Sequence, residues 1–139
     1  GMGGMLVCRI LEQSPEVMQE VSTLVIQAQS DLCEVRKMIH KIGFFIEKEK
    51  FCMDAGKPYL VMRAVRGEEK TPYEPAEYEY GRLLPEASDA AYRSYLLDER
   101  DKKMKLQETL KMQKTSGAGA RVEELTEEIT GLNWILNKF

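Results

Sequence analysis

The sequence has few of the features that would identify a membrane, secreted or metal-binding protein. It contains no run of about 18 consecutive apolar residues, so we expect no membrane-spanning helix. Its three cysteines, Cys8, Cys33 and Cys52, form no Cys-x-x-Cys pair, which argues against a disulfide framework or a zinc site. Free thiols are typical of a reducing compartment, so the composition predicts a cytoplasmic protein.

The sequence also lacks a net positive charge and a glycine-rich phosphate-binding loop. The chain carries 20 basic and 23 acidic residues, a net charge of −3, which provides no overall basic field to attract nucleic acid. The segment Gly117-Ala118-Gly119 lacks the lysine and the hydroxyl residue of a phosphate-binding loop. We therefore expect no cofactor, no metal, no catalytic residue and no nucleic-acid partner.

What the sequence does contain is a long stretch of helical periodicity. Ser14-Pro15-Glu16 is typical of a helix start, and Asp54-Ala55-Gly56 followed by Pro58 is typical of a helix end. The spacing predicts one long helix over 15–54, with Gly43 as the position where it would kink or break. Its apolar residues recur in steps of three and four: Val17, Val21, Leu24, Ala28, Leu32, Val35, Ile39, Ile42 and Ile46.

Two short apolar runs and one proline-rich segment complete the first part of the chain. Residues 5–11 are strand-like, and residues 59–65 could either pair with them as a two-stranded ribbon or form a short helix. Residues 67–85 contain three prolines and three tyrosines, which predicts an extended surface loop whose tyrosines pack on the helices.

The last part of the chain has the most regular apolar pattern. Two helices are expected over 86–115 and 121–138, joined by a short turn and folded back antiparallel. The second helix carries a heptad seam, which is typical of a coiled coil. These seam residues are the candidate interface with a partner: Val122, Leu125, Ile129, Leu132, Leu136 and Phe139.

These patterns together predict a mainly α fold in a single helical domain of 1–139, with at most a small two-stranded β element. The leading functional hypothesis is a non-enzymatic scaffold or adaptor that acts through protein–protein association. A helix over 15–54 would be longer than its own domain, and the seam ends at the chain terminus. We therefore also expect a homo-oligomer.

Two other functions remain open from the sequence. A basic helix face could make the protein a nucleic-acid-associated regulator, and its candidate residues are Arg36, Lys37, His40 and Lys41. Alternatively, helical carboxylates could belong to an all-α, magnesium-dependent nucleotide hydrolase. The nearest patterns are Glu124-x-x-Glu127 and the row Glu12, Glu16 and Glu20.

Overall fold

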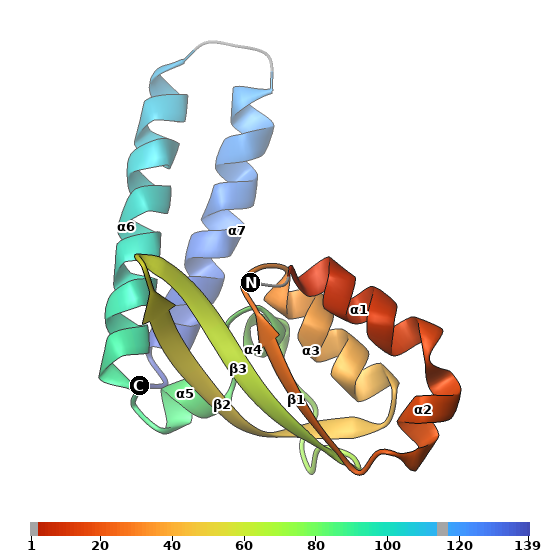
Figure 1. Cartoon of the computed structure of the whole chain (residues 1–139). Coiled ribbons are helices and arrows are strands. Elements are labelled where there is room, and N and C mark those ends of the chain that lie inside the picture. The colour runs from red at the N-terminus through yellow and green to blue at the C-terminus, as the bar shows by residue number, and fades with distance from the viewer. Residues whose placement is uncertain (1–2, 114–116) are drawn as a thin grey trace. The chain divides into compact units, whose positions relative to one another are not determined.

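The computed structural model describes residues 3–113 and 117–139 (Figure 1). Its contacts divide the chain into two compact units, residues 1–84 and residues 85–139. Unit 1 contains most of the elements, and α5 (Leu83–Glu86) spans the boundary. The elements of unit 1 are α1 (Gly4–Gln13), α2 (Pro15–Glu20), β1 (Thr23–Ala28), α3 (Leu32–Lys41), β2 (Phe44–Asp54), β3 (Lys57–Arg66) and α4 (Pro75–Tyr80).

A three-stranded antiparallel sheet forms the centre of unit 1. The strand order is β1-β3-β2, so β3 is the central strand and pairs with both neighbours. A two-residue turn joins β2 to β3, and both of its residues have positive φ, 50° at Ala55 and 78° at Gly56. Positive φ at both central residues is the requirement of a type I′ hairpin, whose twist matches that of the strands.

One face of this sheet is buried beneath helices. Helices α1 and α3 pack against each other and against the strands (Figure 1). Their contribution to the core includes Val7, Leu11, Val35 and Ile39. The strands contribute the alternating residues Ile26, Ala28, Phe44, Ile46, Leu60, Met62 and Ala64. Apolar area removed from water stabilises unit 1 by roughly 25 cal/mol per Å².

The mainly α prediction is wrong because the expected helix over 15–54 is in fact α2, β1, α3 and β2. Gly43 has a φ of 88° and its N–H donates to the carbonyl of His40, so α3 ends there. A step of four residues also keeps two side chains on one face of a strand. Leu24 and Ala28 have this spacing within β1, and so they fitted the helical pattern equally well.

The charged run Glu47–Lys50 hid the strand β2 from the sequence analysis. The predicted helix over 15–54 includes this run, in which polar residues follow one another without the alternation of a strand. In the structure a β-bulge lies between Ile46 and Lys48 and shifts the alternation by one residue. Glu49 then takes an inward position and is buried against Arg36. Hydrophobic patterning cannot detect an inward position that a paired charge occupies.

Three smaller expectations are also corrected. Residues 5–11 form a helix, α1, because Val7 and Leu11 are one helical turn apart and both are buried. Residues 59–65 are strand rather than helix, and they pair with β1 and β2. The expected loop over 67–85 contains the helix α4, in which Pro75 occupies a position in the first turn that needs no N–H.

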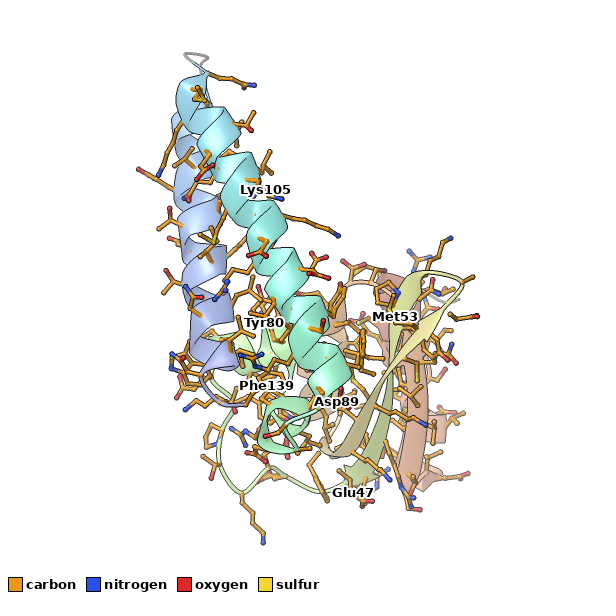
Figure 2. All side chains as sticks on the ribbon, turned by 90° about the vertical axis from the view of Figure 1, so that its left-hand side faces the viewer. Glu47, Met53, Tyr80, Asp89, Lys105 and Phe139 are labelled. Carbon is orange, nitrogen blue, oxygen red and sulfur yellow. The ribbon has the colours of Figure 1, made fainter. Side chains whose placement is uncertain are left out.

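Unit 2 consists of two helices, α6 (Ala90–Met112) and α7 (Ala118–Leu136). They lie side by side as a hairpin (Figure 1) and occupy the regions expected to be helical. The Asp89 side chain caps α6 by accepting a hydrogen bond of 2.8 Å from the N–H of Tyr92. Figure 2 shows Asp89 at the beginning of α6 and Lys105 further along the same helix. The middle of the expected turn, residues 114–116, lies outside the described residues.

Every helix that the described residues form is too short or too polar to cross a bilayer.

Candidate functional site

A group of interacting polar side chains in unit 1 lies between α3 and the segment that follows β3. We call it the α3 polar cluster, and it brings together residues that are far apart in the sequence. Its members are Arg36, His40, Glu49, Glu69, Tyr73 and Tyr78.

Arg36 is the centre of this cluster and is completely buried. Its Nε and Nη2 atoms donate to Glu49 Oε1 over 3.0 and 2.8 Å. Its Nη1 atom donates to the carbonyls of Tyr78 and Glu79, over 2.7 and 3.0 Å. A guanidinium suits the carbonyl end of a helix because the last carbonyls carry partial negative charge. Arg36 therefore joins α3, β2 and α4.

Glu49 has room beside Arg36 only because residue 81 is glycine. A Cβ atom at Gly81 would lie 2.6 Å from Glu49 Oε2 and 3.0 Å from Arg36 Nη2. Gly81 also has a φ of 87°, a conformation that other residues rarely adopt. Both properties make glycine necessary at the end of α4, where the chain approaches the buried ion pair.

His40 links α3 to the two ends of the following segment. Its Nε2 atom lies 2.9 Å from Glu69 Oε2 and its Nδ1 atom lies 2.8 Å from Tyr78 Oη. Because a carboxylate only accepts, Nε2 donates to Glu69, and a neutral His40 then accepts from the Tyr78 hydroxyl. This carboxylate–imidazole–hydroxyl row has the connectivity of a proton relay, in which the acid orients the ring.

Tyr73 fills the space beside this row. Its ring lies edge-on to His40 with centroids 4.7 Å apart, and the Arg82 guanidinium lies 4.2 Å from its centroid. Burial, followed by the charges of Glu69 and Glu49, raises the pKa of the Tyr73 hydroxyl, which therefore stays protonated. The prediction that the tyrosines of this segment pack on a helix is confirmed for Tyr73 and Tyr78.

Arg82 links parts of the segment that follows β3 to one another. It donates to the carbonyls of Thr71 and Pro72 over 2.8 and 2.6 Å, and to the Glu77 carboxylate over 2.6 and 3.0 Å. These bonds and those of Arg36 and His40 fix residues 69–82 on α3. The geometry thus provides a rigid support, with one hydrogen-bonded row that could move a proton.

The structure divides the basic face expected on α3 into two parts. Arg36 and His40 point into the α3 polar cluster, whereas Lys37 and Lys41 are exposed and line a groove with Arg9 of α1. Sequence analysis missed Glu49, Glu69 and Gly81, because nothing in the local pattern shows which side chains meet Arg36 and His40. A role of this face in binding nucleic acid stays a prediction.

The seam residues lie in unit 2, mostly facing α6. Leu125 and Leu132 are fully buried and Leu136 is nearly so, within this one chain. Val122, Ile129 and Phe139 are half-buried, and the Phe139 ring centroid lies 6.3 Å from that of Tyr92. The seam residues are thus buried or half-buried within the hairpin of this one chain. Their role as an interface with a partner stays a prediction.

The carboxylates considered for magnesium are not brought together as a site. Glu124 forms an ion pair with Arg121 of the same helix, with 3.0 Å between Oε2 and Nη1. Within residues 3–113 and 117–139, no group of three or more His, Cys, Asp and Glu side chains could hold a metal ion.

Comparison with known proteins gives one family. The family model of TrmK, tRNA (adenine(22)-N(1))-methyltransferase, matches residues 1–133. None of the curated proteins matches the chain.

Solved structures of low sequence identity share the fold. The Bacillus subtilis m1A22 tRNA methyltransferase TrmK is 20% identical with a TM-score of 0.84, over 98% of this chain and 60% of that chain. A Streptococcus agalactiae protein described as belonging to the NADB-Rossmann superfamily is 21% identical with a TM-score of 0.83, over 98% and 57%. Mycoplasma capricolum TrmK, in complex with S-adenosyl-homocysteine, is 17% identical with a TM-score of 0.81, over 99% and 57%. The chain thus spans between 57% and 60% of the length of these structures.

These comparisons overturn the functional predictions from the sequence. The expectation of a non-enzymatic scaffold is wrong, and so is that of an all-α nucleotide hydrolase, because the matching family consists of tRNA methyltransferases. The expectation that nucleic acid is not a partner is wrong for the same reason. The fold is the one shared with these solved structures, with a three-stranded antiparallel sheet in unit 1, and not a helical bundle. Composition failed here because net charge reports on the whole chain and not on one surface.

Proposed function

The chain belongs to the tRNA (adenine(22)-N(1))-methyltransferase family, and on this premise we propose that it takes part in methylating N1 of adenosine 22 in tRNA. The family match over residues 1–133 carries this proposal. The likeness of the fold to Bacillus subtilis TrmK supports it. Because the chain spans about three fifths of the length of such structures, the proposal concerns the protein in which this chain acts.

The methyl donor of this proposed reaction is S-adenosylmethionine. Mycoplasma capricolum TrmK was solved with S-adenosyl-homocysteine, described there as the natural cofactor product. In a protein that binds it, this donor would supply the methyl group for the adenine N1, and its sulfur would keep the electron pair of the broken carbon–sulfur bond.

An apolar groove beside β1 does not fit the donor. This groove, of about 490 Å³, is lined by aliphatic and methionine side chains and by Gln27. It offers no carboxylate to accept the ribose hydroxyls, which a nucleoside site usually provides. We therefore assign donor binding to no residue of this chain and derive no step of methyl transfer through it.

In this proposal the α3 polar cluster has a supporting role. Arg36 and His40 fix residues 69–82 against the sheet, through contacts of 2.7–3.0 Å. A rigid support keeps neighbouring groups within the narrow tolerance that catalysis requires. Transfer RNA is the proposed partner, and the cytoplasm, where the free thiols are also expected to persist, is the proposed location.

The modification state of cellular tRNA tests the proposed function. Deleting the coding segment for this chain should abolish the m1A22 modification, read as loss of the reverse-transcription stop at position 22. Restoring the segment should restore the stop, and a transcript with guanosine at position 22 should show none. A stop at position 22 that persists after the deletion, or that never existed in the parent strain, would contradict the proposal.

A further inference from the structure

The outward face of the β2–β3 hairpin is the second surface of unit 1 with a defined chemistry. Residues directly opposite on paired strands lie on the same face of the sheet. Lys48 of β2 is paired with Arg63 of β3, and Lys50 is paired with Val61. Their neighbours along the strands, Glu49 and Met62, are buried on the other face. Lys48, Lys50 and Arg63 are all exposed.

This face carries a net positive charge. Two acids are associated with it: Glu47 at the β-bulge, whose Oε1 lies 3.5 Å from Arg63 Nε, and Asp54, which is paired with Lys57 at the end of the hairpin. Figure 2 shows Glu47 and Met53 near the two ends of β2. Four cations, with Lys57 included, and two carboxylates leave an excess of two positive charges on a chain whose net charge is −3. The charge of this face is therefore opposite in sign to that of the whole molecule.

Protection of the sheet edge does not account for all of these cations. Lysines on an edge strand prevent pairing with other chains, and Lys48 and Lys50 lie on β2, which is an edge strand. Arg63, however, lies on β3, between two paired strands, where no edge needs protection. Its side chain is about half exposed, at 54%.

Apolar and aromatic side chains adjoin the cations. Val61 and Tyr59 are half-buried on the outward face of β3, and Tyr59 is paired with Cys52 of β2. A sheet face with an aromatic ring and flanking lysine or arginine side chains is suited to RNA, because bases stack on the ring and phosphates pair with the cations.

We propose that the outward face of the β2–β3 hairpin, with Lys48, Lys50 and Arg63, is a contact surface for the phosphate backbone of the tRNA. This inference rests on the proposed function, since the partner is the RNA on which the family acts. The cations supply contacts that do not depend on base sequence, and Tyr59 provides a stacking surface beside them. The surface lies on the side of the sheet opposite to α3, so it is separate from the α3 polar cluster.

A matched pair of triple variants tests this surface. The first variant, Lys48→Gln, Lys50→Gln and Arg63→Gln, removes three exposed charges from the hairpin face. The control, Lys102→Gln, Lys105→Gln and Lys111→Gln, removes three exposed charges from α6 of unit 2. Binding of the full chain to an unmodified tRNA transcript is measured by fluorescence anisotropy at several salt concentrations.

The first variant should bind tRNA at least about tenfold more weakly than the wild type at moderate salt. The slope of log affinity against log salt should become shallower by about two to three, since each phosphate contact contributes about 0.7–0.9. The control should keep wild-type affinity and slope.

Three results distinguish failure of the proposed surface from failure of the proposed function. Wild-type binding by the hairpin variant, or weakened binding by the control alone, would overturn the proposed surface while leaving the proposed function in place. No binding of tRNA by the wild-type chain would also overturn the proposed surface, and the cellular test of the m1A22 modification then decides the proposed function. If circular dichroism shows that the triple variant is unfolded, the double variant Lys48→Gln and Lys50→Gln replaces it, with an expected slope change of about one to two.

Discussion

The two units of the chain place their ion pairs in opposite environments. In unit 1 the side chains of Arg36 and Glu49 are both fully buried, whereas in unit 2 those of Arg121 and Glu124 are 41% and 65% exposed. A buried charge that loses its partner is strongly destabilising, whereas an exposed pair contributes about 0–1 kcal/mol. Unit 1 therefore depends on one charged contact, while unit 2 should depend on its apolar seam.

Among the variants that test this comparison, removing the Arg36 side chain should change stability the most. Arg36→Met leaves the Glu49 carboxylate buried without its cation, and we expect unit 1 to lose about 3–5 kcal/mol of stability. Native-state hydrogen exchange of the β3 amides measures this loss within unit 1. The double variant Arg36→Met and Glu49→Leu should recover most of it, since neither partner is then left charged. A loss of under about 1 kcal/mol for Arg36→Met would show that water reaches Glu49.

Truncating the seam should have the next largest effect, confined to unit 2. Leu125→Ala removes a fully buried side chain between α6 and α7, and large-to-small changes of this kind cost about 2–5 kcal/mol. Trp134, the single tryptophan, lies in α7 and reports unfolding of unit 2 by its fluorescence. Leu106→Ala, at a position that is 43% exposed, is the control and should cost well under half as much. Equal losses at both positions would contradict a seam closed within the chain.

Much of unit 2 could be predicted from the sequence, because its helices are held by local periodicity. Leu125 and Leu132 are one heptad apart and both are buried, as the pattern predicted. Unit 1 could not be predicted in the same way. His40 and Glu69 are 29 positions apart, and their contact depends on the sheet that lies between them in the chain. Glu49 occupies a position of β2 that is usually apolar. The alternation of apolar and polar residues that reveals a strand is therefore interrupted at the α3 polar cluster.

Adding a methyl group at position 81 tests how strongly the stability of unit 1 depends on the buried ion pair of Arg36 and Glu49. Gly81→Ala should destabilise unit 1 by about 1–3 kcal/mol, because φ is 87° and the new Cβ would press against Glu49. Hydrogen exchange in α4 and β2 measures the change. Gly119→Ala, in α7 with nothing within 4 Å of its added Cβ, should instead stabilise its helix by about 0.5–1 kcal/mol. Wild-type exchange in Gly81→Ala would show that α4 can move away from the ion pair.

The smallest effect is expected from the pH dependence of Glu128 in unit 2. Burial raises the pKa of this carboxylate, but hydrogen bonds and charges from Lys103 and Arg121 outweigh it and lower the pKa overall. Since the folded pKa lies below the unfolded one, the added stability is present above the unfolded value, about 4.5, and disappears as the pH falls through the folded value.

Comparison of the wild type with Glu128→Gln measures this contribution. The wild type should be more stable by at most about 1 kcal/mol at pH 7, because Glu128 is 37% exposed, and the advantage should vanish in acid. Unfolding followed by Trp134 fluorescence gives the difference at each pH, with Glu127→Gln on the exposed side of α7 as control. An advantage above about 2 kcal/mol, or one that persists in acid, would mean that unit 2 also depends on a charged contact, and the contrast with unit 1 would not hold.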